Sequence, residues 1–146
     1  MQSNYEMIQM CVLTCGLVGL SAEDIKKQEL HGWLIFLLGI SGIVVSVWGN
    51  GWKNIAWLWG LLPGVLVLLL AWVTKESIGY GDALVILSMG CFYALAEMMG
   101  IIMMAITFAG IAALVLLVVL HKNRKCELPF VPFLLGAHLV MWRLQR

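Results

Sequence analysis

The sequence has little charge and almost no aspartate. Only 12% of its 146 residues are charged, and aspartate occurs twice, at Asp24 and Asp82. Hydrophobic residues make up 62% of the chain, and the mean hydropathy is +0.97. A soluble domain of this length could not bury so much apolar surface. The composition therefore excludes an ordinary soluble fold and predicts that lipid is the solvent.

Cysteine, histidine and basic residues are also few, and their spacing excludes several kinds of site. None of the four cysteines forms a CxxC pair, so neither a disulfide framework nor a zinc site is predicted. The three histidines lack ligand spacing, and we expect no metal or other cofactor. No basic stretch is interleaved with aromatic residues, which argues against a nucleic-acid partner. The residues concerned are Cys11, Cys15, Cys91, Cys126, His31, His121 and His138.

The apolar residues fall into six segments, which predict an all-α membrane protein, a polytopic bundle of about six transmembrane helices. Short polar connections join the segments, so residues 1–146 are interpreted as a single integral-membrane domain. The fourth and fifth segments nearly run together, and Gly100 is the expected break between two antiparallel helices. The segments are 5–20, 32–48, 55–73, 83–99, 101–120 and 129–142.

The basic residues predict an orientation. Lys and Arg concentrate in cytoplasmic loops, and most of them here fall in the first, third and fifth connections. These connections are therefore expected in the cytoplasm and both termini outside. Residues 1–6 carry no Lys or Arg, so the start of the chain is interpreted as a first membrane helix, not a signal peptide. The basic residues of the three connections are Lys26, Lys27, Lys75, Lys122, Arg124 and Lys125.

Each aspartate lies where an apolar segment meets a short polar loop, and the predicted topology puts both on the cytoplasmic side. Two nearby carboxylates can share one proton, so that one accepts a proton from water and the other donates to a leaving group. If the first and fourth helices pack side by side, Asp24 and Asp82 face each other. A helix N-terminus favours the ionised form of Asp82 and hence the role of base, which leaves Asp24 as the acid.

The loop before the second aspartate reads Gly79-Tyr80-Gly81-Asp82. Glycine allows another chain to approach the backbone closely, so an extended substrate could lie here. The simpler interpretation is a turn with Asp82 as a helix cap, and a solvated loop charge at Asp24.

Three patches in this order resemble the type IV prepilin peptidases, a family of GxGD membrane aspartyl proteases. They are Asp24-Ile25-Lys26-Lys27, Gly79-Tyr80-Gly81-Asp82 and Leu128-Pro129-Phe130-Val131-Pro132-Phe133. The resemblance implies hydrolysis of the basic leader of a prepilin or pseudopilin at the cytoplasmic edge of a bacterial or archaeal plasma membrane. It implies Asp24 and Asp82 as catalytic residues. It also implies Gly79, Tyr80, Gly81 and Lys26 as substrate-binding residues.

The chain departs from the family pattern at three places. Leu30-His31-Gly32 stands where Ile-Pro-Asn is common, and Leu84 stands where a lysine commonly follows the GxGD aspartate. The paired CxxC motifs of the long, bifunctional members are missing, so N-methyltransferase activity is not expected.

Two other interpretations remain open. A non-catalytic membrane scaffold or transporter subunit would use Asp24 as loop charge and Asp82 as helix cap. A transport pathway, however, calls for ionisable residues in mid-span, and the segments have almost none. A presenilin-type protease would carry its first aspartate inside a helix, whereas Asp24 is expected in a charged loop.

Overall fold

A computed structural model describes residues 2–27, 30–50, 56–74, 79–118 and 129–144. These residues form only helices, and the predicted helical membrane bundle is confirmed. Three helices are long and apolar enough to cross a membrane, namely α1, α2 and α5, while the described parts of the other three are shorter. The helices are α1 (Gln2–Lys27), α2 (Gly32–Asn50), α3 (Ala56–Val73), α4 (Tyr80–Gly90), α5 (Leu95–Val118) and α6 (Val131–Leu144).

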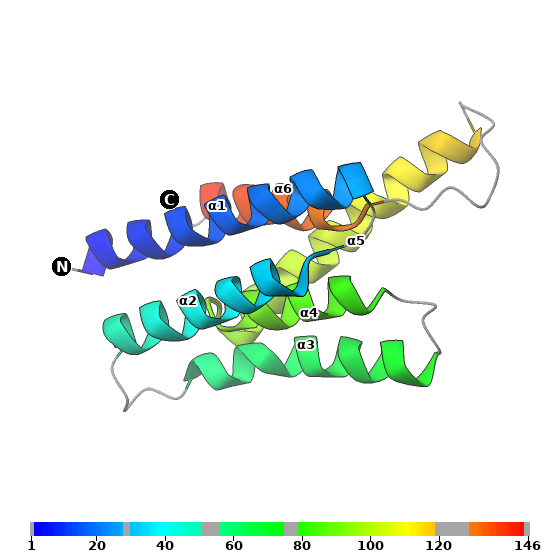
Figure 1. Ribbon diagram of the computed structural model, residues 1–146. Helices are drawn as coiled ribbons and strands as arrows, with labels where there is room; N and C mark the ends of the chain where they lie inside the picture. The colour runs from blue at the N-terminus through cyan, green and yellow to red at the C-terminus, as the bar shows by residue number, and fades with distance from the viewer. Residues whose placement is uncertain (1, 28–29, 51–55, 75–78, 119–128, 145–146) are drawn as a thin grey trace.

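Successive helices run in opposite directions along the bundle (Figure 1). The last turns of α1, α3 and α5 and the first turns of α2, α4 and α6 therefore lie at one end, opposite both chain termini. Helix α1 packs against α2 and α6, and α4 packs against α3 and α2, while α5 crosses the bundle obliquely behind them. This arrangement brings the first turns of α4 and α6 to the same end as the last turns of α1.

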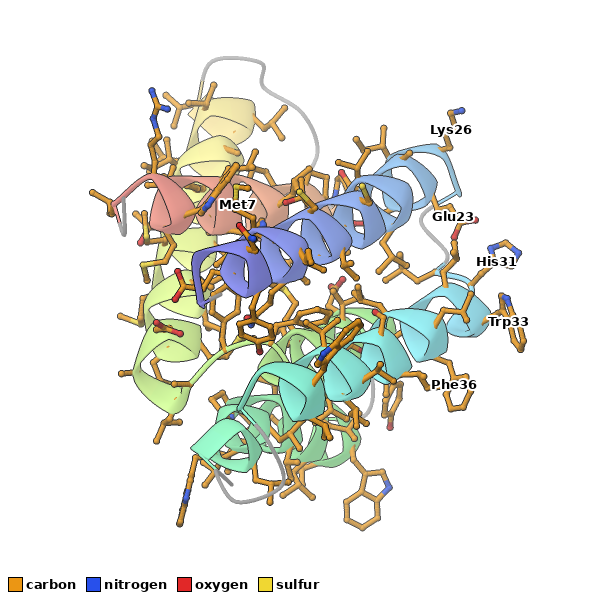
Figure 2. All side chains as sticks on the ribbon, turned by 90° about the vertical axis from the view of Figure 1, so that its left-hand side faces the viewer. Met7, Glu23, Lys26, His31, Trp33 and Phe36 are labelled. Carbon is orange, nitrogen blue, oxygen red and sulfur yellow. The ribbon has the colours of Figure 1, made fainter. Side chains whose placement is uncertain are left out.

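The core is built from apolar side chains, but apolar side chains also cover the outside. Leu13, Leu17 and Leu20 follow a helical repeat on α1 and are buried in the core. By contrast, Trp33 and Phe36 on α2 point away from the bundle and are 69% and 61% exposed (Figure 2). A large exposed apolar surface is typical of a protein that is surrounded by lipid.

Helices α3 and α4 approach each other most closely, and two glycines one turn apart on α3 allow this. A Cβ atom at Gly60 would collide with the carbonyl oxygens of Gly90 and Tyr93, and one at Gly64 would collide with the backbone of Leu87. Small residues four apart let membrane helices pack backbone to backbone. This contact fixes α4, and with it Asp82, against α3.

A hydrogen-bonded group of three side chains lies halfway along the bundle, and we call it the inner polar cluster: Thr14, Tyr93 and His138. Thr14 donates to the Met10 carbonyl at 2.7 Å, so its oxygen is free to accept from His138 Nε2, 2.9 Å away. The other ring nitrogen, Nδ1, then accepts from the Tyr93 hydroxyl at 2.6 Å. The cluster therefore joins α1, α6 and the segment between α4 and α5.

The expected break at Gly100 is wrong. Helix α4 ends at Gly90 and α5 begins at Leu95, so Gly100 lies inside α5. Glu97 explains the early start, because its carboxylate accepts a hydrogen bond from the Ala94 N–H at 3.3 Å, as in half of a capping box. Side chains of Gln9 and Ser46 donate to the carbonyls of Phe92 and Cys91, which satisfies the backbone where the helix is interrupted.

The expected end of the first helix is also wrong. Helix α1 continues to Lys27, beyond the apolar segment, so Asp24 lies on a helix and not in a loop. The physical reason is that hydrophobicity ends at Leu20 while helix propensity does not. Ala, Glu and Lys are good helix formers, and lysines in a last turn interact favourably with the helix dipole.

Candidate active site

Asp24 is the more enclosed of the two aspartates. It lies near the end of α1 and is only 6% exposed. Its Oδ2 atom accepts a hydrogen bond from the backbone N–H of Val131, the first residue of α6, at 3.0 Å. The N–H of Phe130 also donates to this carboxylate. The beginning of α6 thus supplies two backbone donors to Asp24, across more than 100 residues of sequence.

The first turn of α6 is built so that these donors are available. The first N–H groups of any helix lack partners within the helix. Here Pro132 has no N–H, and the N–H groups of Phe133 and Leu134 both bond to the Phe130 carbonyl, at 3.0 and 3.2 Å. The N–H groups of Phe130 and Val131 remain, and both are directed to Asp24.

Asp82 is in a different environment. It lies in the first turn of α4, at the same end of the bundle, and is half-buried. Burial and, second to it, the charge of Asp24 raise the pKa of Asp82 to about 6. The two carboxylates are therefore close enough to influence each other, although 57 residues separate them in sequence.

The aspartates do not approach through direct packing of α1 on α4, the arrangement considered from the sequence. Helices α1 and α4 share no extensive contact, and α2 packs against both. The approach is made at the helix ends, where Leu30, just before α2, lies against Gly81 at the start of α4. The structure therefore does not meet the condition of side-by-side packing of the first and fourth helices, but both aspartates lie at the same end of the bundle.

The glycines on either side of Tyr80 play different parts. A Cβ atom at Gly81 would lie 2.8 Å from Leu30 Cδ1, so this glycine is used for packing within the chain. A Cβ atom at Gly79 would lie 3.2 Å from Oδ2 of Asp82, so this glycine keeps space open beside the carboxylate. Tyr80 is 37% exposed at the same end.

Lys26 and Glu23 flank Asp24 on α1 but face different ways (Figure 2). Lys26 is exposed and projects outward, two positions and therefore about 200° around the helix from Asp24. Glu23 lies between α1 and α2, with its Oε1 atom 3.3 Å from His31 Nδ1. The sequence had pointed to Lys26 but not to the Glu23–His31 pair.

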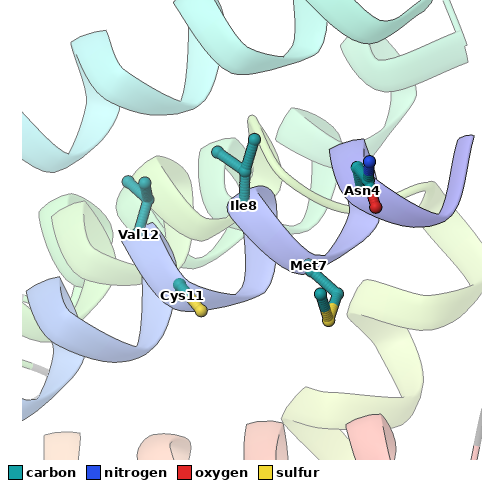
Figure 3. A pocket seen from close by; sticks show the side chains of 5 residues that line it. All are labelled: Asn4, Met7, Ile8, Cys11 and Val12. Carbon is teal, nitrogen blue, oxygen red and sulfur yellow. The ribbon is translucent and has the colours of Figure 1, made fainter. Parts of the chain in front are cut away.

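The other candidate features lie away from the aspartates. A shallow groove on the N-terminal half of α1 is lined by Asn4, Met7, Ile8, Cys11 and Val12 (Figure 3). Within the described ranges no three His, Cys, Asp or Glu side chains come together as a metal-binding group. Cys126 and His121 lie outside the described residues.

The fold and the site together define a helical membrane protein with two interacting carboxylates at one end of the bundle. Residues 11–118 match the model of the type IV leader peptidase family, and the chain belongs to that family. The match includes Asp24 and Asp82 and ends before α6. No curated protein and no solved structure shows significant similarity to the chain. Membership of this family implies that the chain is a peptidase.

Family membership also distinguishes the chain from a presenilin-type protease. The loop position expected for Asp24 argues against a presenilin-type protease, but Asp24 lies on α1, so the structure removes that argument. The match to the leader peptidase family is therefore the evidence that separates the chain from presenilin-type proteases.

Proposed function

We propose that the chain is an aspartic endopeptidase that removes the basic leader of type IV prepilins or pseudopilins. The observation that carries the proposal is the position of the only two aspartates, which lie at one end of the bundle and interact electrostatically. Membership of the leader peptidase family supports it. A pair that shares one proton can activate water and protonate the leaving amine without a metal ion.

The proposed substrate enters at the aspartate end from the cytoplasmic side of the plasma membrane. A leader peptide joins its hydrophobic helix at the membrane edge, and the two aspartates lie at the edge of this bundle. Gly79 and Tyr80 are the proposed contacts nearest the scissile bond, because Gly79 leaves space beside Asp82. Gly81 acts by packing on Leu30, and Lys26 is a peripheral contact for the polar part of the substrate or for lipid headgroups.

A co-expression assay tests the proposal. A tagged prepilin encoded in the same genome is expressed with the wild-type chain, with Asp24→Asn or with Asp82→Asn, and its length is followed by immunoblotting. We expect the wild type to shorten the prepilin and both variants to leave it at full length while still reaching the membrane. If the wild type leaves every candidate prepilin intact, the scaffold or transporter interpretation takes its place.

A further inference from the structure

We propose that the N-terminus of α6 determines the catalytic roles of the two carboxylates, so that Asp24 is the general base and Asp82 the general acid. This proposal rests on the proposed aspartic peptidase function. It reverses the roles expected from the position of each aspartate on its own helix. Its basis is the pair of backbone donors that α6 gives to Asp24.

The first step of the argument is the difference in hydrogen bonding. A carboxylate that accepts backbone N–H bonds is favoured in its ionised form, and the positive end of a helix dipole adds to this effect. Asp24 receives both from α6. Burial opposes ionisation at both aspartates and is the largest single influence on each, but only Asp24 receives backbone donors that oppose it.

The second step is the state of Asp82. The start of α4 favours its ionised form, but burial and the charge of Asp24 outweigh this and raise its pKa to about 6. An ionised Asp24 therefore keeps the shared proton on Asp82. The difference in protonation between the two aspartates therefore comes from α6, a helix that contains neither of them.

The roles give a balanced reaction. Asp24 takes a proton from water as the water oxygen bonds to the scissile carbonyl carbon. Asp82 gives its proton to the amide nitrogen as the carbon–nitrogen bond breaks. Asp24 is then protonated and Asp82 ionised, and a proton passes back from Asp24 to Asp82 before the next cycle.

The other titratable groups described at this end are Glu23 and Lys26 on α1, His31 before α2 and Tyr80 on α4, while the start of α6 has none. Glu23 and His31 pair with each other. A Glu23→Gln variant therefore serves as a control for any pH effect that arises from this pair instead of Asp24.

Val131→Pro tests the proposal through activity. Proline removes the N–H that bonds to Asp24, has nearly the volume of valine, and is well tolerated at the first position of a helix. We expect the acidic limb of the kcat/KM profile to move about one pH unit higher, since each lost backbone donor weakens the ionised form. Val131→Ala keeps the N–H and is the matched control, with both limbs unchanged. Equal profiles for the two variants would overturn the proposal.

Infrared spectroscopy of the purified protein tests the same proposal without activity or substrate. At pH 5 we expect the C=O band of a protonated carboxyl group to disappear in Asp82→Asn and to persist in Asp24→Asn. A band that disappears in Asp24→Asn and persists in Asp82→Asn would place the proton on the wrong carboxyl group. If the wild type cleaves no prepilin, the proposed function fails, and the spectra still decide which carboxyl group holds the proton.

Discussion

The aspartate end and the inner polar cluster are both polar regions in an apolar bundle, but their polar groups differ in how completely they are hydrogen-bonded. In the inner cluster a chain of hydrogen bonds runs from Tyr93 through His138 and Thr14 to a backbone carbonyl. At the aspartate end both carboxyl groups are removed from water, but Asp24 accepts backbone hydrogen bonds, while burial and the neighbouring charge of Asp24 raise the pKa of Asp82. A fully hydrogen-bonded cluster stabilises the fold, whereas groups with perturbed pKa values are typical of functional sites.

The largest expected effect is on cleavage. Asp24→Asn and Asp82→Asn should each lower kcat by about 10²–10⁴-fold, the usual contribution of a positioned acid or base. The double variant should lose little more than either single variant, because the two carboxyl groups act as one unit. Single-turnover cleavage of a purified prepilin measures this. Losses that multiply in the double variant would mean that the two aspartates act independently.

Substitutions in the inner polar cluster should lower the stability of the fold and leave the pH dependence of cleavage unchanged. His138→Ala leaves the buried hydroxyl of Tyr93 with only the weak acceptor Met10 Sδ, 3.5 Å away, and opens a cavity, so we expect a loss of about 2–4 kcal/mol in unfolding free energy. Unfolding in detergent measures it, with Leu139→Ala on the exposed face of α6 as the control. The pH limbs of cleavage by the surviving folded protein should not move. A shift of either limb would connect the cluster to the chemistry.

Asp82→Asn should stabilise the fold at neutral pH, although it removes activity. Between pH 3.8, its ordinary pKa, and about 6, the folded state holds a proton that the unfolded state has lost, so stability falls as pH rises through this window. Above it, the neutral asparagine should be more stable by about 2 kcal/mol, after allowance for screening of a half-buried group. Unfolding curves at pH 3.5 and 7.5 check this, and an equal gain at both values would contradict it.

Lys26→Gln should have the smallest effect. The side chain is exposed and projects outward from the bundle, so its interactions are screened by water and ions (Figure 2). We expect cleavage to change by about fivefold at most, and by less at high salt. A loss as large as that of the aspartate variants would mean that Lys26 binds the substrate directly.

The sequence was enough to predict a helical bundle and to locate the aspartates at one end. Hydrophobic segments and alternating helix direction determine both, since a membrane restricts where chain ends can lie. It was not enough to predict where helices end. The polar residues after Leu20 continue α1, and Glu97 starts α5 in the middle of an apolar stretch.

The partner of Asp24 was the hardest feature to predict. The contact is made by the backbone of Val131, and a backbone N–H has no signature in the sequence. The prolines were the available signal, since Pro132 marks the first turn of a helix, where N–H groups are left over. The direction of these groups toward Asp24 depends on how α1 and α6 pack, and only the structure gives that.

The contact between Asp24 and α6 also has a consequence for the order of synthesis. The ribosome makes Asp24 more than 100 residues before Val131, so the nascent chain holds both aspartates before the backbone donors of α6 exist. A chain interrupted before residue 130 has the acidic pair but not the environment that distinguishes its members. Asp24 therefore receives its backbone donors only when α6 packs against α1, so the difference between the two carboxyl groups is established late in folding.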